Sequence, residues 1–306
     1  MAHLRFIPAG GALVEVTTRT QHGRLLLRPH PDLNEIVLGV LARAQRLYLS
    51  PGTGICAFAF LANHYHLLLR VRDAGELAGF MRYFNSNLAR ELARRVDWRN
   101  HVWSRRYHAA VVSEEPEAQL ARLRYLLAHG VKEGLVEHPS EWPGAHCVRP
   151  LLDGTPVEGY WFNRTQEYFA RRRKEDFARL RYATRESLDL LPIPCWDGLA
   201  PEVRRAKAGA LVAEIVREEK IRRGGKPPLG VERVLRQHPH DLPFKSKRSP
   251  APQFHTSSRE ARKALRADYR EFARAFRHAA LQLRAGNRDA PFPAGSFPPA
   301  LPFVCG

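Results

Sequence analysis

The first 112 residues switch between two hydrophobic periods, and the order of these switches limits the folds that the chain can adopt. Short β-rich or alternating apolar runs predict strands, whereas apolar residues at helical spacing predict helices. The predicted elements are a strand over residues 13–18, a helix over 33–48, strands over 55–61 and 64–71 (continuous or bent near residues 62–63), a helix from 76 to 92 and a strand over 102–112. This β-α-β-β-α-β order predicts an α+β fold with a ferredoxin-like antiparallel sheet that carries helices on one face.

A third helix is predicted over residues 117–129, because Gly130 directly follows it and glycine is common just after a helix end. Its predicted buried stripe consists of Leu120, Leu123 and Leu127. Tyr125 and His129 lie roughly opposite this stripe. Since they are four residues apart, they are neighbours on the helix surface.

The sequence changes character after residues 139–144, and we expect two domains, residues 1–149 and a basic, mainly helical C-terminal extension over 150–306. The expected parts of the extension are a loop-rich stretch over 150–200, a helix over 202–223, a helix between an N-cap at Ser257 or Ser258 and Gly286, and an extended proline-rich strap from Pro291 to Phe303.

The net charge points to a polyanionic partner. The chain has 49 Lys and Arg residues against 31 Asp and Glu, a formal net charge of +18. The excess is 19 against 13 in residues 1–150 and 30 against 18 in residues 151–306, so it is not confined to a basic tail. Nucleic acid is the natural interpretation because neutralised phosphates release counterions, and a solvated arginine-rich surface is the alternative.

Other features of the composition favour an intracellular protein. The four cysteines are scattered without a CxxC pair, which is typical of reduced thiols. The N-terminus lacks an apolar core of signal-peptide length, and no uncharged stretch approaches the roughly 18–20 residues that span a bilayer. We therefore expect a soluble, cytoplasmic protein without a membrane partner.

His64-Tyr65-His66 follows the apolar run 55–61. In a strand, residues two apart project to the same side, so both imidazoles leave one face while Tyr65 leaves the other. Two such histidines can bind one cation, although a buried histidine with a satisfied hydrogen bond is the commoner case. The chain has no glycine-rich phosphate loop, no nucleophile elbow and no clustered carboxylates that would make a competing site.

Five segments resemble the REP-associated tyrosine transposases, which belong to the single-tyrosine HUH transposase superfamily. The segments are Val14-Glu15-Val16-Thr17-Thr18-Arg19, Asn63-His64-Tyr65-His66-Leu67-Leu68, residues 80–87, Val102-Trp103-Ser104-Arg105-Arg106-Tyr107, and Arg124-Tyr125-Leu126-Leu127 with residues 131–136. They follow the order and spacing of the family and cover roughly residues 10–146. The second half looks like the extension of a longer bacterial subgroup.

The resemblance implies a ferredoxin-like nuclease domain that cleaves and rejoins single-stranded DNA next to a REP-like hairpin. His64 and His66 would hold a divalent metal ion, and Tyr125 would be the nucleophile that forms a 5′-phosphotyrosine. His129 stands where the family has an amide ligand, and a three-histidine site favours Mn²⁺ or Zn²⁺ over Mg²⁺. Glu15 stands where the family has a histidine.

Several residues are candidates for DNA contacts. They are Trp103, Arg105, Arg106 and Tyr107 as a basic-aromatic cluster, Arg122 beside the tyrosine, and Asn85 and Asn87 as readers of base edges. Solvated arginines and capping or solvated asparagines are the alternatives. We expect the second half to widen the DNA footprint instead of supplying chemistry, with residues 171–174 and 245–248 on phosphates.

Two other functions compete with a transposase and single-strand DNA endonuclease. One is a non-catalytic, domesticated protein that binds hairpin DNA or RNA. The other is a three-histidine zinc hydrolase acting on a small molecule, which would leave Tyr125 and the charge without a role. The sequence assigns no oligomeric state.

Overall fold

A computed structural model describes residues 4–173, 178, 180–243 and 251–299. Its central sheet has the strand order β2-β3-β1-β4-β7. The strands are β1 (Ala12–Arg19), β2 (Gly54–Phe60), β3 (His64–Val71), β4 (His108–Val112) and β7 (Phe254–His255). β1 to β4 are antiparallel in the ferredoxin-like order, which confirms the predicted fold class, and β7 adds a short parallel edge.

The two predicted strands before and at the His-Tyr-His motif are separate strands that form an antiparallel hairpin with a turn at residues 61–63. Phe60 pairs with Tyr65, and the amide of Leu61 donates to the carbonyl of His64 at 2.8 Å. The prediction of a strand over 102–112 is wrong in its first half, because only residues 108–112 pair along β1. In the segment before them Trp103 makes an isolated bridge to Thr20, and Arg105 and Arg106 are exposed.

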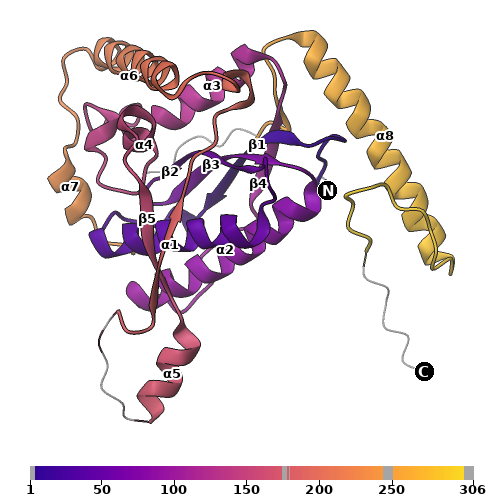
Figure 1. The fold of residues 1–306 in the computed structure, drawn as a ribbon, viewed down its shortest axis with the longest axis horizontal. Coiled ribbons are helices and arrows are strands. Elements are labelled where there is room, and N and C mark those ends of the chain that lie inside the picture. The colour runs from indigo at the N-terminus through magenta and orange to yellow at the C-terminus, as the bar shows by residue number, and fades with distance from the viewer. Residues whose placement is uncertain (1–3, 174–177, 179, 244–250, 300–306) are drawn as a thin grey trace.

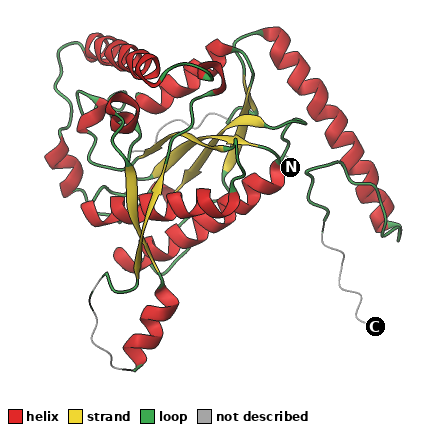
Figure 2. Cartoon of the chain, viewed as in Figure 1, coloured by secondary structure: helices red, strands yellow, loops and turns green. Residues whose placement is uncertain are grey.

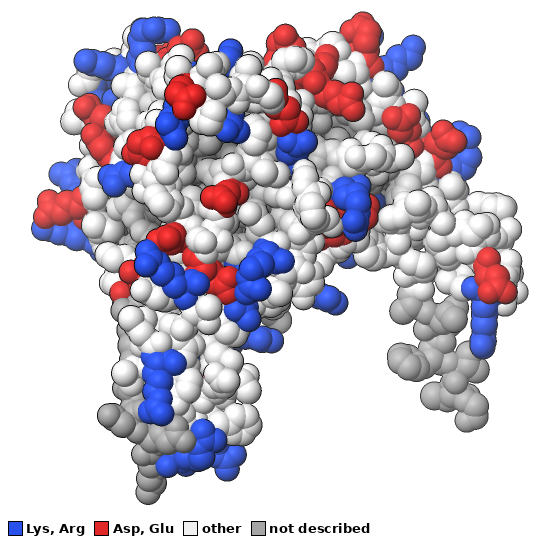
Figure 3. Space-filling view, in the orientation of Figure 1, with Lys and Arg blue, Asp and Glu red and all other residues white. Residues whose placement is uncertain are grey.

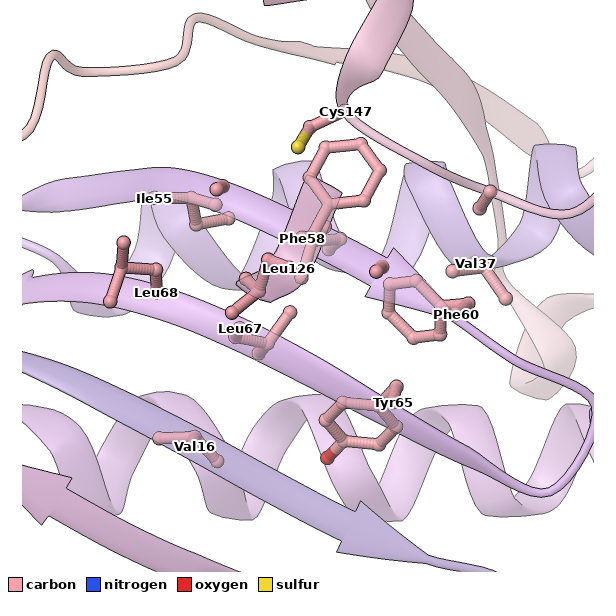
Figure 4. Packing of buried hydrophobic residues seen from close by; sticks show 14 of the residues in the cluster. Val16, Val37, Ile55, Phe58, Phe60, Tyr65, Leu67, Leu68, Leu126 and Cys147 are labelled. Atoms are coloured by element: carbon pink, nitrogen blue, oxygen red, sulfur yellow. The ribbon is translucent and has the colours of Figure 1, made fainter. Parts of the chain in front are cut away.

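Helices cover both faces of the sheet. The helices α1 (Pro31–Tyr48) and α2 (Ala74–Arg95) lie side by side against one face, as predicted. The helix α3 (Pro116–Leu127) packs on the opposite face, over β2 and β3 (Figure 1). The fully buried side chains Tyr65, Phe58 and Leu67 lie between the sheet and the α1–α2 layer (Figure 4). His64 and His66 therefore point towards α3.

The second half is mainly helical, with one hairpin that the sequence did not predict. Its helices are α4 (Val148–Asp153), α5 (Arg164–Arg172), α6 (Pro201–Arg223), α7 (Val231–Arg236) and α8 (Arg259–Arg284, with Ser258 as N-cap). The strands β5 (Val157–Phe162) and β6 (Ala183–Leu188) pair within the stretch expected to be loop-rich (Figure 2). Short 3₁₀ turns lie at Gln21–Gly23, Pro139–Glu141 and Pro194–Trp196. The sequence did not predict this pair because its two strands are far apart along the chain. Both strands pack on α1, a long-range contact that a local pattern does not reveal.

Contacts between the two halves are extensive. β5 and β6 lie on α1, α6 packs on α3 and α4, and β7 pairs with β4. The proline-rich strap returns along α8, where Phe292 meets Phe276 with ring centroids 5.4 Å apart, and residues 300–303 of that strap lie outside the described residues. The division at residue 149 stays a prediction. Among the described residues, no helix is long and apolar enough to cross a membrane.

The crossing of α1 and β5 depends on two glycines. A Cβ at Gly39 would lie 2.3 Å from the backbone of Tyr160, and one at Gly159 would lie 2.1 Å from the carbonyl of Glu35. Both partners are backbone atoms, so they cannot rotate away as a side chain can. The two halves of the chain can approach this closely only without side chains at these positions.

We predict that Gly39→Ala lowers the free energy of unfolding by about 1–3 kcal/mol, the usual cost of overpacking. Gly209→Ala in α6 is the matched control, because the nearest atom to its Cβ is 4.0 Å away. The control should be neutral or stabilise the protein by about 0.4–1 kcal/mol. Urea unfolding monitored by circular dichroism measures both, and equal midpoints for the two variants would contradict the packing argument.

Candidate functional site

Three histidines meet between the sheet and α3. β3 places His64 and His66 on one face, and His129 follows the C-terminal end of α3. The ring centroids of His66 and His129 are 4.4 Å apart, and those of His64 and His129 are 5.8 Å apart. One nitrogen from each of the three rings lies within 4.8 Å of the other two. The arrangement can hold a metal ion.

Hydrogen bonds set the orientation of each ring. The Nδ1 atoms of His64, His66 and His129 lie 2.6, 2.9 and 3.2 Å from Asn63 Oδ1, Glu15 Oε1 and the Leu126 carbonyl, respectively. Carbonyl and carboxylate oxygens only accept, so each Nδ1 carries the proton and each Nε2 keeps a free lone pair. The Nε2 atom of His129 is buried without a hydrogen-bond partner among the described residues, which is the state expected of a ligand atom.

Burial keeps the three imidazoles neutral. It is the largest cause of the lowered pKa of each ring, and the neighbouring His66 adds to it for His64 and His129. For His66, the carboxylate of Glu15 opposes part of this shift. Neutral imidazole is the form that ligates metals, so the site is ready to bind a cation near neutral pH.

Tyr125 lies at the edge of this cluster. Its ring centroid is 4.8 Å from that of His129 and 5.4 Å from that of His66. Lys132 Nζ lies 3.3 Å from the ring centroid, and the guanidinium carbon of Arg122 lies 4.9 Å from it. Burial, then Glu15, raise the pKa of the Tyr125 phenol, whereas Arg122 lowers it. These side chains alone therefore favour the neutral phenol.

Two charged residues near the cluster were not predicted to be part of the site. Burial lowers the pKa of Lys132 to about 8. Glu15 is almost fully buried on β1, and burial alone would raise its pKa, but the close approach of His255 and His66 outweighs burial and holds the pKa far below its ordinary value. Glu15 Oε2 also lies 3.6 Å from Arg122. Lys132 and Glu15 are within the segments of the family resemblance, but their contacts depend on the fold.

The predicted DNA-contacting aromatic and basic residues gather in a surface hollow of about 520 Å³. Trp103, Arg105, Arg106, Tyr107 and Asn85 line it, together with Arg5 and Phe297. The amide oxygen of Asn85 accepts the hydroxyl of the buried Tyr65, and its carbonyl accepts Trp103 Nε1 at 3.0 Å. Asn87 donates to the carbonyl of Tyr83 within α2 at 2.8 Å and is not among the lining residues.

The charge of the second half is unevenly distributed. On the face shown in Figure 3, basic and acidic side chains are interspersed over the body, whereas basic ones gather on the protrusion that carries α5. Arg171 lies there and pairs with Glu167 at 2.9 Å, and Arg172 is exposed beside it. Residues 174 and 245–248 of the predicted phosphate contacts lie outside the described residues.

His146 supports the cluster from outside it. Its Nδ1 accepts the amide of Val148 at 3.0 Å, and its Nε2 lies 3.3 Å from the Leu126 carbonyl that His129 also uses. This arrangement requires a neutral ring with the proton on Nε2, the opposite tautomer to that of the cluster. Burial lowers the pKa of His146 to about 4.

We predict that stability falls as the pH drops from about 6.5 to 4. In this window the unfolded chain protonates residue 146, with a pKa of about 6.5, whereas the folded chain does not. Each buried neutral histidine then lowers the free energy of unfolding by up to about 1.4 kcal/mol for every unit by which the pH falls. His146→Gln, which keeps a donor for Leu126, should make the pH dependence of the urea midpoint shallower by this amount. An unchanged pH dependence would contradict the assigned ring state.

Comparison with known proteins finds a family that is similar to part of this chain. Residues 40–125 match the family described as "Transposase IS200 like". The solved structures that are similar include a REP-associated tyrosine transposase bound to a REP hairpin (16% identity, 50% of this chain and 87% of that chain, TM-score 0.39). They also include a protein of Deinococcus radiodurans R1 described as a candidate transposase (18% identity, 40% of this chain and 95% of that chain, TM-score 0.28). No curated protein matched the chain.

The family match covers most of the cluster of histidines and tyrosine. The matched segment runs from α1 to α3 and contains both histidines of β3 and the tyrosine of α3. His129 follows its end by four residues. The part of the chain that carries Tyr125 and both histidines of β3 is therefore similar to the IS200-like transposase family.

Proposed function

We propose that this protein is a transposase that cleaves and rejoins single-stranded DNA beside a hairpin, with Tyr125 as the nucleophile and a divalent cation held by three histidines. The observation that carries the proposal is that one ring nitrogen from each of His64, His66 and His129 meets the other two within 4.8 Å, next to Tyr125. The net charge of +18 and the hollow lined by basic and aromatic residues support a nucleic-acid substrate.

The donor set fits a cation that accepts nitrogen ligands. Three neutral imidazoles favour Mn²⁺ or Zn²⁺, with Mg²⁺ less suited to them. A bound cation supplies charge stabilisation for the phosphate and lowers the energy of the negative phenolate. The protein's part is to hold the three rings in place through the acceptors of their Nδ1 protons.

Tyr125 attacks the scissile phosphorus through its Oη atom. The Oη–P bond forms while the bond from phosphorus to the 3′ oxygen breaks, so the products are a 5′-phosphotyrosine and a free 3′-OH. The phenol loses one proton and the 3′ oxygen gains one. Arg122 and Lys132 lie against the ring and can counter the phosphate charge. The phosphotyrosine bond keeps the energy of the broken phosphodiester bond, so a second strand can be joined without another energy source.

The hollow beside β4 is the proposed path for unpaired bases. Trp103 and Tyr107 provide aromatic surfaces for stacking, and the exposed Arg105 and Arg106 are free to meet phosphates. A REP hairpin is the ligand of the solved transposase named above, and we propose a hairpin of this kind for this chain. Asn85 contributes to the hollow by holding Trp103 and Tyr65, while direct base reading by Asn85 and Asn87 stays a prediction.

A zinc hydrolase for small molecules is less favoured. It would use the three histidines but would leave unexplained why Tyr125, Arg122 and Lys132 surround them. A non-catalytic hairpin-binding protein would keep the basic hollow but would not need the free Nε2 atoms. The two experiments below separate these functions from a transposase.

We predict that wild-type protein becomes covalently attached to hairpin DNA labelled at its 3′ end and that Tyr125→Phe does not, because only the phenol oxygen can form the link and the linked strand is the one on the 3′ side of the cleaved bond. Denaturing gels measure the protein-linked label. Tyr83→Phe on α2, behind the sheet, is the control and should label like the wild type. Equal labelling of Tyr125→Phe and wild type would refute the nucleophile, and no labelling of either with intact binding would favour a binding protein.

We predict that His64→Ala weakens Mn²⁺ binding by more than the roughly 10–100-fold that the loss of an outer-shell partner costs, and abolishes cleavage. Binding of hairpin DNA should be largely retained, because affinity comes mostly from phosphate contacts. Isothermal titration with Mn²⁺ and DNA-binding assays measure the two effects. His278→Ala, an exposed histidine on α8, is the control. Normal cleavage by His64→Ala in metal-limited buffer would refute the site.

A further inference from the structure

The C-terminal half reaches the histidine cluster through the short strand β7. Val111 and Val112 of β4 pair with Phe254 and His255, and the amide of Ser113 donates to the His255 carbonyl at 2.9 Å. The amide of Ser257 donates to the carboxylate of Glu115 at 2.9 Å. The strand is therefore anchored at the junction between β4 and α3, the helix that carries Tyr125.

A buried aromatic contact fixes the same strand from the other side. Phe254 is 8% exposed, and its ring lies 6.4 Å from that of Phe6 and 6.3 Å from that of Tyr269 on α8. His108 Nε2 lies 2.8 Å from the carbonyl of Pro252. Residues 252–257 thus have a defined position on the sheet, although they lie more than 100 residues beyond the matched family segment.

The register of β7 directs His255 into the site. Val112, its partner, pairs with Leu13, and Leu13 and Glu15 lie on the same face of β1. His255 Nε2 consequently lies 2.9 Å from Glu15 Oε2. The other oxygen of this carboxylate lies 2.9 Å from His66 Nδ1. One buried carboxylate thus joins β7 to a proposed metal ligand.

We propose that His255 is a positioning residue of the active site, and that the C-terminal half contributes it to hold Glu15 against His66. The inference rests on the proposed metal role of His66. It departs from the expectation that the second half only widens the DNA footprint. Carboxylates that orient metal-binding histidines are part of the metal site in function, and His255 extends this support by one more residue.

The reason for a second partner lies in the competition for Glu15. Arg122 is 3.6 Å from Oε2, the same oxygen that His255 contacts at 2.9 Å. With His255 gone, Arg122 is the remaining side chain beside that oxygen among the described contacts. Glu15 would turn towards Arg122, which loosens its bond to His66 and draws Arg122 away from the ring of Tyr125. Both effects disturb the site without unfolding it.

The test compares His255→Ala with His255→Gln in the full chain. Gln can place an amide donor near the position of Nε2, so it should restore what Ala removes. We expect His255→Ala to weaken Mn²⁺ binding about 10-fold, the lower end of the range for outer-shell partners, and to lower kcat for hairpin cleavage with little change in KM. His255→Gln should bind Mn²⁺ with an affinity within about twofold of wild type, which is a small loss beside the roughly 10–100-fold cost of removing an outer-shell partner.

His108→Ala is the matched control, because it removes a histidine that holds the same segment but bonds to Pro252. If His108→Ala and His255→Ala weaken Mn²⁺ binding equally, or if His255→Gln fails to rescue a folded protein, the positioning role is refuted and β7 is structural only. Unchanged Mn²⁺ binding in His255→Ala also overturns it. Failure of the wild type to bind Mn²⁺ would refute the proposed metal site itself, a result distinct from the others.

Discussion

The site depends on three hydrogen bonds that fix the Nδ1 protons of its histidines. Asn63, Glu15 and the Leu126 carbonyl each accept from one ring, so each ring is held in the tautomer whose Nε2 is free. The three acceptors come from a β-turn, a strand and a helix end. Without them the rings could rotate or exchange tautomers, and three nearby imidazoles would not define a site for one cation.

The fold explains how such distant acceptors come together. Antiparallel pairing sets Thr17 opposite His66, and Glu15 lies two residues further along the same face of β1. At the end of α3 the carbonyl of Leu126 accepts the backbone amide of His129 and also lies near both His129 Nδ1 and His146 Nε2. The strand register and the helix end thus decide the chemistry of the rings, and the ferredoxin-like sheet serves as the frame that fixes both.

Local patterns predicted the parts of the fold and site that depend on local structure. Short apolar or β-rich runs located β1, β2 and β3, and helical spacing located α1, α2, α3 and α8, because these local patterns reflect how each element packs against the core. The same reasoning placed Tyr65 on the opposite face from its histidine neighbours. The same patterns predicted that β4 begins at residue 102, six residues too early. Val102 and Trp103 have β propensity, but they lack a neighbouring strand to pair along.

Long-range contacts could not be predicted in this way. The hairpin of β5 and β6 owes its place to glycine contacts with α1, and β7 is only two residues long, too short for any periodicity. His255 and Lys132 contact Glu15 and Tyr125 through tertiary packing. The resemblance identified the ligands and the nucleophile, whereas the residues that orient and charge-balance them are visible only in the structure.

The most direct test of this account is the tautomeric state of the three rings. Two-bond ¹H–¹⁵N correlation spectra of histidine-labelled protein distinguish a protonated Nδ1 from a protonated Nε2, and single substitutions assign His64, His66 and His129. We expect all three to carry the proton on Nδ1, His146 to carry it on Nε2, and added Zn²⁺ to shift the Nε2 signals of the three cluster rings alone. A protonated Nε2 on any ring of the cluster, or a Zn²⁺ response elsewhere, would contradict the account.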